Sequence, residues 1–110
     1  MNSIEFDKVL ENRIRKIREV LQTKGKEYAL ADKLSNFKRA ADLEGVTSIQ
    51  ALLGFVAKHI IALYDFAKRD DISYGQWEEK LGDTINYMIL LDGILIEEIN
   101  NDLKVKGILQ

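Results

Sequence analysis

The sequence predicts an all-α protein, a single-domain bundle of about four helices that is completed by association with further copies of the chain. Its 110 residues contain no proline, the residue that most disrupts helix interiors. Apolar residues recur at three- and four-residue steps along most of the chain, which is the spacing of one face of an α-helix. We expect one domain over residues 1–110, with a tail at 102–110 that shows no clear period.

The first two helices are predicted in the N-terminal half of the chain. The stripe from Phe6 to Leu21 predicts a helix that ends near the Lys24-Gly25-Lys26 segment. A shorter stripe from Leu34 to Leu43 predicts a second helix. This helix should stop at Gly45, because glycine readily adopts the left-handed conformation that closes helices.

The last two helices are longer and more apolar. Thr47 and Gln50 have the spacing of a capping box, which predicts the start of a third helix that runs to Arg69. After a loop over residues 70–75, the fourth helix should extend from Gln76 to Asn100.

The fourth helix is apolar on more than one side. Its main stripe consists of Trp77, Leu81, Ile85, Met88, Leu95 and Ile99, and further apolar residues cover much of the remaining circumference, namely Ile89, Leu90, Leu91, Ile94 and Ile96. We expect such a helix to be buried on most sides, and in a chain this short a second copy is the simplest cover. The alternative is that the first helix alone covers it.

Composition and charge narrow the classes of partner. Sixteen basic and eighteen acidic residues give a net charge of -2, which makes nucleic acid an unfavourable partner. There is no cysteine, the start does not resemble a signal peptide, and the longest uncharged run (45–57) is shorter than the roughly 20 residues that cross a bilayer. We therefore expect a cytoplasmic protein without a membrane segment, in the host cytoplasm if the chain is encoded by a phage.

Two ionisable residues fall within apolar stripes. A helical wheel places His59 in the middle of the stripe of the third helix, and Asp92 among the main-stripe residues of the fourth. A buried carboxylate needs a partner. One interpretation is a structural hydrogen bond between His59 and Asp92, and the other is that both line a polar cavity.

A second set of polar residues lies on the same two helices: Lys58 and Asp65 on the third, and Glu79, Asp83, Asn86 and Tyr87 on the fourth. Spacings of three and four place the last four residues on adjoining turns of one face. Carboxylates in this arrangement can share a divalent cation, and Asn and Tyr side chains can bind a sugar or a base edge. The alternative is a solvated charged face.

These residues carry a resemblance to a known family. The segments 24–29, 36–37, 58–59 and 79–87 resemble small phage and prophage proteins of the nucleotide-modification-associated domain type, which are in turn similar to the MazG-like all-α nucleotide pyrophosphatases. The resemblance covers about residues 24–98. It implies a nucleotide or nucleotide-derived ligand. Tyr28, Asn36 and Phe37 can form a lid over the site or pack a loop.

The resemblance also implies Mg²⁺ held by two carboxylate pairs on neighbouring helices. Glu79 and Asp83 can stand for one pair, but Asp65 is the only acidic residue between Thr47 and Arg69, where the other pair should lie. Lys58 and His59 stand there instead, and Lys58 suits a phosphate. A metal site of Glu79, Asp83 and Asp65 would therefore be incomplete for activating water.

Three functions remain open. The first is a phage-type accessory protein that binds a nucleotide or nucleotide-derived signal through Lys58, His59, Asp83, Asn86 and Tyr87, and sequesters it to counter a host defence. The second is a divergent Mg²⁺-dependent nucleotide pyrophosphohydrolase. The third is an inhibitor that binds a host nuclease or another host defence protein and needs no ligand pocket.

Overall fold

The computed structural model describes residues 1–23 and 26–107, with side chains except those of residues 23–33 and 105. This part of the chain contains four α-helices, one π-helical turn and no β-strand, which confirms the all-α prediction. The elements are α1 (Ser3–Arg18), η1 (Glu19–Thr23), α2 (Lys26–Glu44), α3 (Ser48–Ala67) and α4 (Tyr74–Val105).

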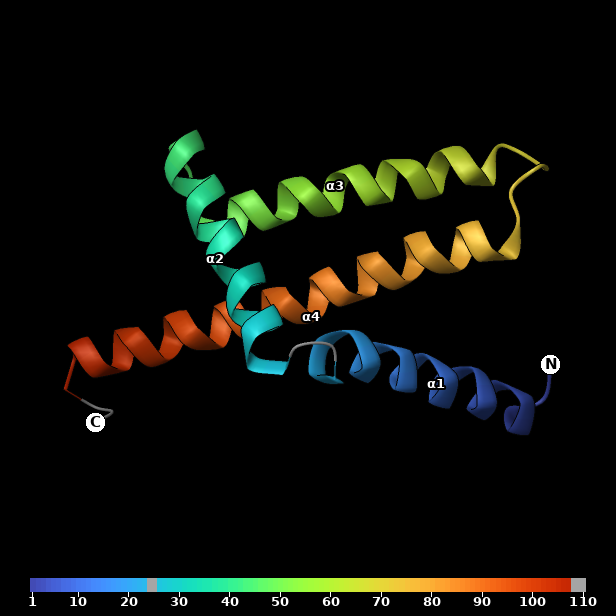
Figure 1. Ribbon diagram of the computed structural model, residues 1–110, viewed down its shortest axis with the longest axis horizontal. Helices are drawn as coiled ribbons and strands as arrows, with labels where there is room; N and C mark the ends of the chain where they lie inside the picture. The colour runs from blue at the N-terminus through green and yellow to red at the C-terminus, as the bar shows by residue number, and fades with distance from the viewer. Residues whose placement is uncertain (24–25, 108–110) are drawn as a thin grey trace.

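The helices form an open arrangement (Figure 1). The long helices α3 and α4 lie side by side in opposite directions and are joined by a short loop, and their mutual contact is the most extensive in the molecule. Helix α2 crosses this pair near the start of α3. Helix α1 lies along the first half of α4, on the side away from α3.

Hydrogen-bonded caps define where three helices begin. In each capping box the first side chain accepts from the backbone N–H three residues later, whose own side chain accepts from the cap backbone N–H. The pairs are Asn2 with Glu5, Thr47 with Gln50, and Ser73 with Gln76. The Thr47 box was predicted from the sequence. The Ser73 box starts α4 two residues before the expected position.

The predicted end of α2 agrees with the structure, whereas α3 ends at Ala67 instead of Arg69 and α1 ends at Arg18. Gly45 has a φ of 70° and follows the last residue of α2, and the Val46 N–H donates to the Ala41 carbonyl over 2.9 Å, so the predicted glycine stop is confirmed. Helix α2 is longer than expected, with 19 residues. Helix α4 continues five residues past Asn100 to Val105, so the tail predicted without a period begins as helix.

The core lies where α2 crosses the α3 and α4 pair. Leu52 is fully buried, and it clusters with Phe37, Val56, Leu90 and Ile94. Helix α1 contributes no buried residue. Among the residues whose side chains are described, the core is therefore small.

The face of α4 that is buried differs from its main apolar stripe. Leu81, Met88, Leu95 and Ile99 are between 40% and 58% exposed, whereas Leu90 and Ile94 are 3% exposed. The main stripe points away from α2, which packs on the opposite side of α4. The expectation that α4 is buried on most sides is not met within one copy of the chain.

Within the described residues one helix, α3, has the length and apolar composition of a membrane-spanning segment. A single helix of this kind is weak evidence, because core helices of water-soluble proteins share these properties.

Candidate functional site

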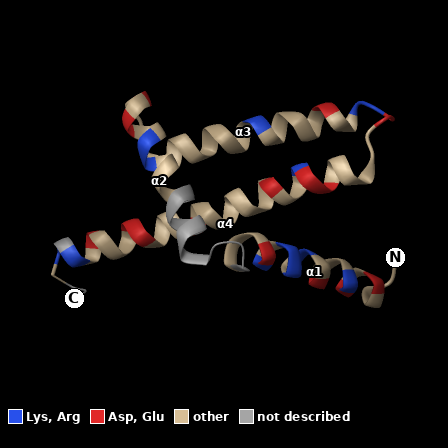
Figure 2. Ribbon diagram, viewed as in Figure 1, with Lys and Arg blue, Asp and Glu red and all other residues tan. Residues whose placement is uncertain are grey.

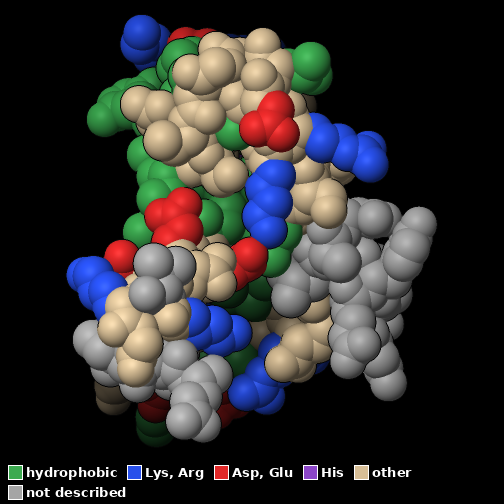
Figure 3. Space-filling view, turned by 90° about the vertical axis from the view of Figure 1, so that its left-hand side faces the viewer, with side chains coloured by type: hydrophobic (Ala, Val, Ile, Leu, Met, Phe, Trp, Pro, Cys, Tyr) green, Lys and Arg blue, Asp and Glu red, His purple; other side chains and the backbone are tan. Residues whose placement is uncertain are grey.

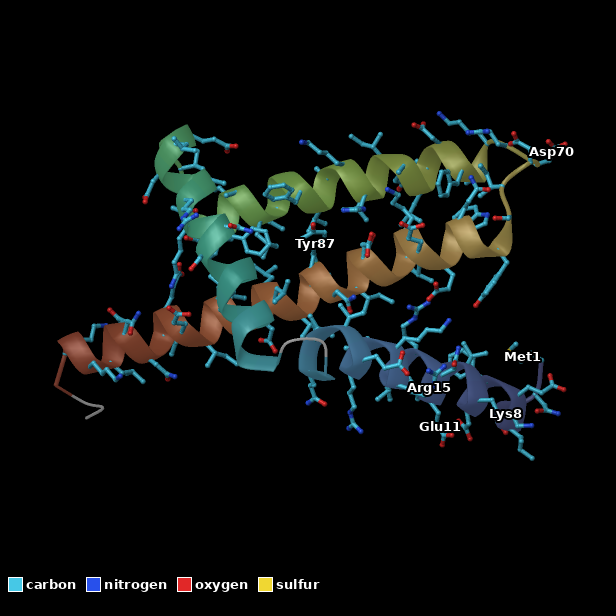
Figure 4. The ribbon with its side chains drawn as sticks, in the orientation of Figure 1. Met1, Lys8, Glu11, Arg15, Asp70 and Tyr87 are labelled. Carbon is cyan, nitrogen blue, oxygen red and sulfur yellow. The ribbon has the colours of Figure 1, made fainter. Side chains whose placement is uncertain are left out.

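Aromatic rings from three helices meet between α3 and α4. The Tyr87 ring centroid lies 5.1 Å from that of His59, 6.0 Å from Phe37 and 6.2 Å from Phe55. Tyr87 points from α4 towards α3 (Figure 4). The structure thus brings together three residues that carry the family resemblance: Phe37, His59 and Tyr87. These residues contact one another through their rings.

The predicted hydrogen bond between His59 and Asp92 is absent. Asp92 is exposed, as are its stripe neighbours Met88, Leu95 and Ile99, so this part of the stripe is not covered by the described chain. His59 is half-buried and points towards α4, as predicted, but its Nδ1 is buried without a hydrogen-bond partner.

Lys58 lies apart from the other candidate ligand-binding residues. Its side chain is exposed and its Nζ lies 5.7 Å from the centre of the Phe55 ring. It lines a shallow hollow of about 110 Å³ with Glu44, Gly54 and Phe55, and neither Asp83 nor Asn86 lines that hollow. Within one copy of the chain, a shared site of Lys58 with Asp83 and Asn86 is therefore not formed.

Asp83 and Asn86 instead line a groove between α1 and α4. The groove has a volume of about 320 Å³, and its walls are mostly charged: Arg13, Lys16, Ile17, Glu19 and Val20 from the α1 side, and Glu78, Glu79, Gly82, Asp83 and Asn86 from α4. Figure 2 shows charged residues gathered on α1 and the neighbouring first half of α4, whereas α3 carries few.

One carboxylate oxygen forms ion pairs with both cations of this groove. Glu78 Oε1 lies 3.1 Å from Lys16 Nζ and 3.2 Å from Arg13 Nη1. The hydrogen bond from Lys16 is the main cause that holds the pKa of Glu78 below its ordinary value, with Arg13 adding to it and partial burial opposing it. Gly82 provides room for Arg13, since a Cβ at this position would lie 2.9 Å from its Nη1.

Asn86 is the buried polar residue of the groove. It is 8% exposed, and its Oδ1 is buried without a hydrogen-bond partner. Asn86 and Asp83 also line a smaller hollow of about 120 Å³ with Val20, Tyr87 and Leu90. Burial is the main cause that raises the pKa of the Tyr87 hydroxyl, and the nearby Asp83 carboxylate raises it further.

An apolar hollow continues from the groove along η1. Its volume is about 430 Å³ and its lining is Ile17, Arg18, Leu21, Gln22, Leu34, Ile89, Leu90 and Gly93. It shares Ile17 with the charged groove and Leu90 with the smaller hollow. The charged and apolar spaces therefore adjoin one another along the same side of α4.

The predicted metal residues do not form a ligand set. Glu79 and Asp83 share the charged groove, but Asp65 does not line it. Among the described residues there is no group of three or more His, Cys, Asp or Glu side chains that could hold a metal ion. Two carboxylates on one helix face do not fit a resident Mg²⁺, which takes several oxygen ligands.

Two further candidate ligand-binding residues, Asn36 and Tyr28, are not seen in the groove. Asn36 is exposed and lines none of these spaces. The side chain of Tyr28 lies outside the described residues. In contrast, Arg13, Lys16 and Glu78 were missed from the sequence, where they look like ordinary surface charges.

Comparison with known proteins adds no assignment. No family model matches the sequence, and no curated protein or solved structure is significantly similar to it.

Proposed function

We propose that this protein binds a nucleotide or nucleotide-derived molecule in the groove between α1 and α4, without converting it. The observation that carries the proposal is Asn86, whose buried Oδ1 has no hydrogen-bond partner, in the wall of a groove that also contains two cations. The proposed site keeps Asp83, Asn86 and Tyr87 from the sequence prediction, and replaces Lys58 by Arg13 and Lys16 as the phosphate-binding residues.

The unpartnered Oδ1 of Asn86 lowers the stability of the protein unless a hydrogen-bond donor binds to it. A buried acceptor without a donor costs about 1–3 kcal/mol, so such groups are rare unless a water or a ligand completes them. A ligand that brings an N–H donor, such as the exocyclic amine of a base, would satisfy Oδ1 once the amide turns towards the groove, because Oδ1 has almost no exposed surface in the unbound protein. Asp83 beside it can accept hydrogen bonds from sugar hydroxyls.

The neighbouring groups suit the other parts of a nucleotide. Arg13 and Lys16 can bind a phosphate once it competes with Glu78 for their N–H donors. The apolar hollow next to the groove can receive the face of a base. Because Glu78, Glu79 and Asp83 would repel a bare polyphosphate, we expect ligands of low negative charge, such as mono- or cyclic nucleotides, to bind better than triphosphates.

Binding is favoured over hydrolysis by the arrangement of the carboxylates. A metal-assisted pyrophosphohydrolase needs several carboxylates around its ions, and among the described residues no group of three or more His, Cys, Asp or Glu side chains is arranged to hold a metal ion. A binder of this type would sequester its ligand. If the ligand is a signal of a host defence, the protein would act against that defence.

The test is calorimetric titration of the purified protein with mono-, cyclic and triphosphate nucleotides, alongside an assay for pyrophosphate release with Mg²⁺. We expect saturable binding of at least one low-charge nucleotide and no turnover. Release of pyrophosphate would support the hydrolase. Absence of binding to every nucleotide would reject the proposal and favour the protein inhibitor.

Matched variants connect the binding to the groove. Asn86→Leu removes the amide with a near-isosteric side chain, so it should keep or raise the thermal stability while it abolishes binding. Asn100→Leu, at an exposed position of α4, is its control. Lys16→Met should weaken binding about tenfold or more, whereas Lys8→Met, on an exposed part of α1 away from the groove (Figure 4), should not.

A further inference from the structure

The α3 and α4 pair has an uncovered apolar side, which we call the outer face. It consists of Leu53, Ile60 and Tyr64 of α3 and Leu81, Met88 and Leu95 of α4, all between 38% and 69% exposed. At about 100° per residue, Leu81, Met88 and Leu95 lie some 140–180° around α4 from the core residue Leu90. Figure 3 shows hydrophobic side chains at the surface along the left of that view, between α3 above and α4 below.

The spacing on the outer face is that of helices that pack on other helices. On α4 the positions 81, 85, 88, 92, 95 and 99 alternate steps of four and three, as the a and d positions of a heptad do. On α3 the positions 53, 57, 60 and 64 follow the same steps. Asp92 is the only charged residue in either series.

The exposed area of the chain is too large for a self-contained domain. A folded monomer of 12.6 kDa is expected to expose about 6,200 Å², whereas this chain exposes 8237 Å², an excess of about 2,000 Å². Its radius of gyration is 16.9 Å, against about 13 Å for a compact domain of this length. A standard protein interface covers about 800 Å² on each partner, so the excess is sufficient for a stable dimer.

We infer that the outer face binds the outer face of a second copy of this chain, so that two α3 and α4 pairs form a four-helix bundle. A helical layer with an apolar side needs a second layer to form a core, and a copy supplies one with the same heptad spacing. The groove residues Glu79, Asp83 and Asn86 lie on another side of α4, so the two surfaces do not overlap.

Asp92 favours a protein partner over a lipid surface. A single polar residue at an a position is tolerated in helical interfaces, where it specifies the register at a cost in stability. A carboxylate pressed into the apolar part of a bilayer costs more, and a chain with a net charge of -2 is not attracted to anionic lipids.

The first test is the mass in solution by light scattering coupled to gel filtration. We expect the intact chain to elute at twice 12.6 kDa at micromolar concentration. The double variant Met88→Glu/Leu95→Glu should weaken association by more than about tenfold and keep its helical circular dichroism. Leu43→Glu, at an apolar position that is 89% exposed but outside the outer face, should leave the dimer intact.

The second test acts in the opposite direction. Asp92→Leu completes the apolar series, so it should strengthen association by about tenfold or more. The inference is overturned if the wild-type protein is monomeric. It is also overturned if neither the Met88/Leu95 double substitution nor the Asp92 substitution changes the measured mass or the strength of association. Flotation of monomeric protein with phosphatidylcholine vesicles would assign the outer face to a membrane instead.

Discussion

Glu78 Oε1 on α4 lies 3.1 Å from Lys16 Nζ on α1. This ion pair and the bond from Arg13 to the same oxygen join α1 to α4. Because α1 has no buried residue, these contacts and the partly buried Ile17 and Leu21 determine how it sits against α4. The groove therefore depends on Glu78.

Replacing Glu78 by Gln should destabilise the protein at neutral pH by about 0.5–1 kcal/mol, since two partly screened cations lose their carboxylate. The measurement is urea unfolding at a fixed protein concentration, which matters if the chain associates. Glu98→Gln, an exposed residue of α4 without an ion pair in the described chain, is the control and should change the free energy of unfolding little.

The same variant predicts a pH dependence. The pKa of Glu78 is lowered from its ordinary value of 4.5 on folding, so the stabilisation is fully present above pH 4.5 and is lost as the pH falls through the lowered pKa. The difference between wild type and Glu78→Gln should therefore disappear in acid. A difference that persists after the carboxylates are protonated would mean that Glu78 acts through packing.

Gly82→Ala and Gly93→Ala form a matched pair on α4. Alanine within a helix is more stable than glycine by about 0.5–1 kcal/mol. A Cβ at Gly93 meets nothing within 4 Å, so that variant should show the full gain in thermal unfolding. A Cβ at Gly82 would displace the Arg13 guanidinium, so Gly82→Ala should gain less and should weaken nucleotide binding. Equal gains would mean that the flexible end of the Arg13 side chain moves aside at little cost, and unchanged nucleotide binding would contradict a role for Arg13 in the site.

The helices could be predicted from the sequence because their signals are local. The Thr47 and Gln50 cap and the Gly45 stop depend on residues a few positions apart, and the structure has both. The caps at Asn2 and Ser73 follow the same pattern and could have been found in the same way. Periodicity could not identify the buried side of α4, because the helix is apolar on nearly every side. The helices that pack against α4 determine which of these sides is buried.

The candidate site was only partly predictable for a related reason. Asp83 and Asn86 share a face of one helix, so their proximity follows from spacing, and the structure places both in the groove. The sequence analysis expected the cation beside them to be Lys58 of α3, whereas the cations that line the groove with them are Arg13 and Lys16 of α1. Arg13 and Glu78 are 65 positions apart in the sequence, and no local pattern relates them. Lys58 was predicted from the resemblance, but its position around α3 places its side chain on an exposed side of that helix.

Leu52→Ala tests whether the small core is the one described. Leu52 is 0% exposed, and a fully buried leucine loses about 2–5 kcal/mol of stability on truncation to alanine. Leu43→Ala is the control, because Leu43 is 89% exposed and should change the free energy of unfolding by less than about 0.5 kcal/mol. Similar effects for the two variants would mean that another part of the chain, or another copy, covers Leu43.

His59→Phe tests the unpartnered ring nitrogen between α3 and α4. The His59 and Tyr87 ring centroids are 5.1 Å apart, and phenylalanine keeps an aromatic ring in this position while it removes the buried Nδ1. We expect a gain of about 1 kcal/mol in the free energy of unfolding, since a polar atom without a partner no longer has to be desolvated. His59→Ala, which loses the ring contact as well, should be destabilising. If His59→Phe is instead less stable than wild type, Nδ1 has a hydrogen-bond partner in solution, and the aromatic cluster is a polar site.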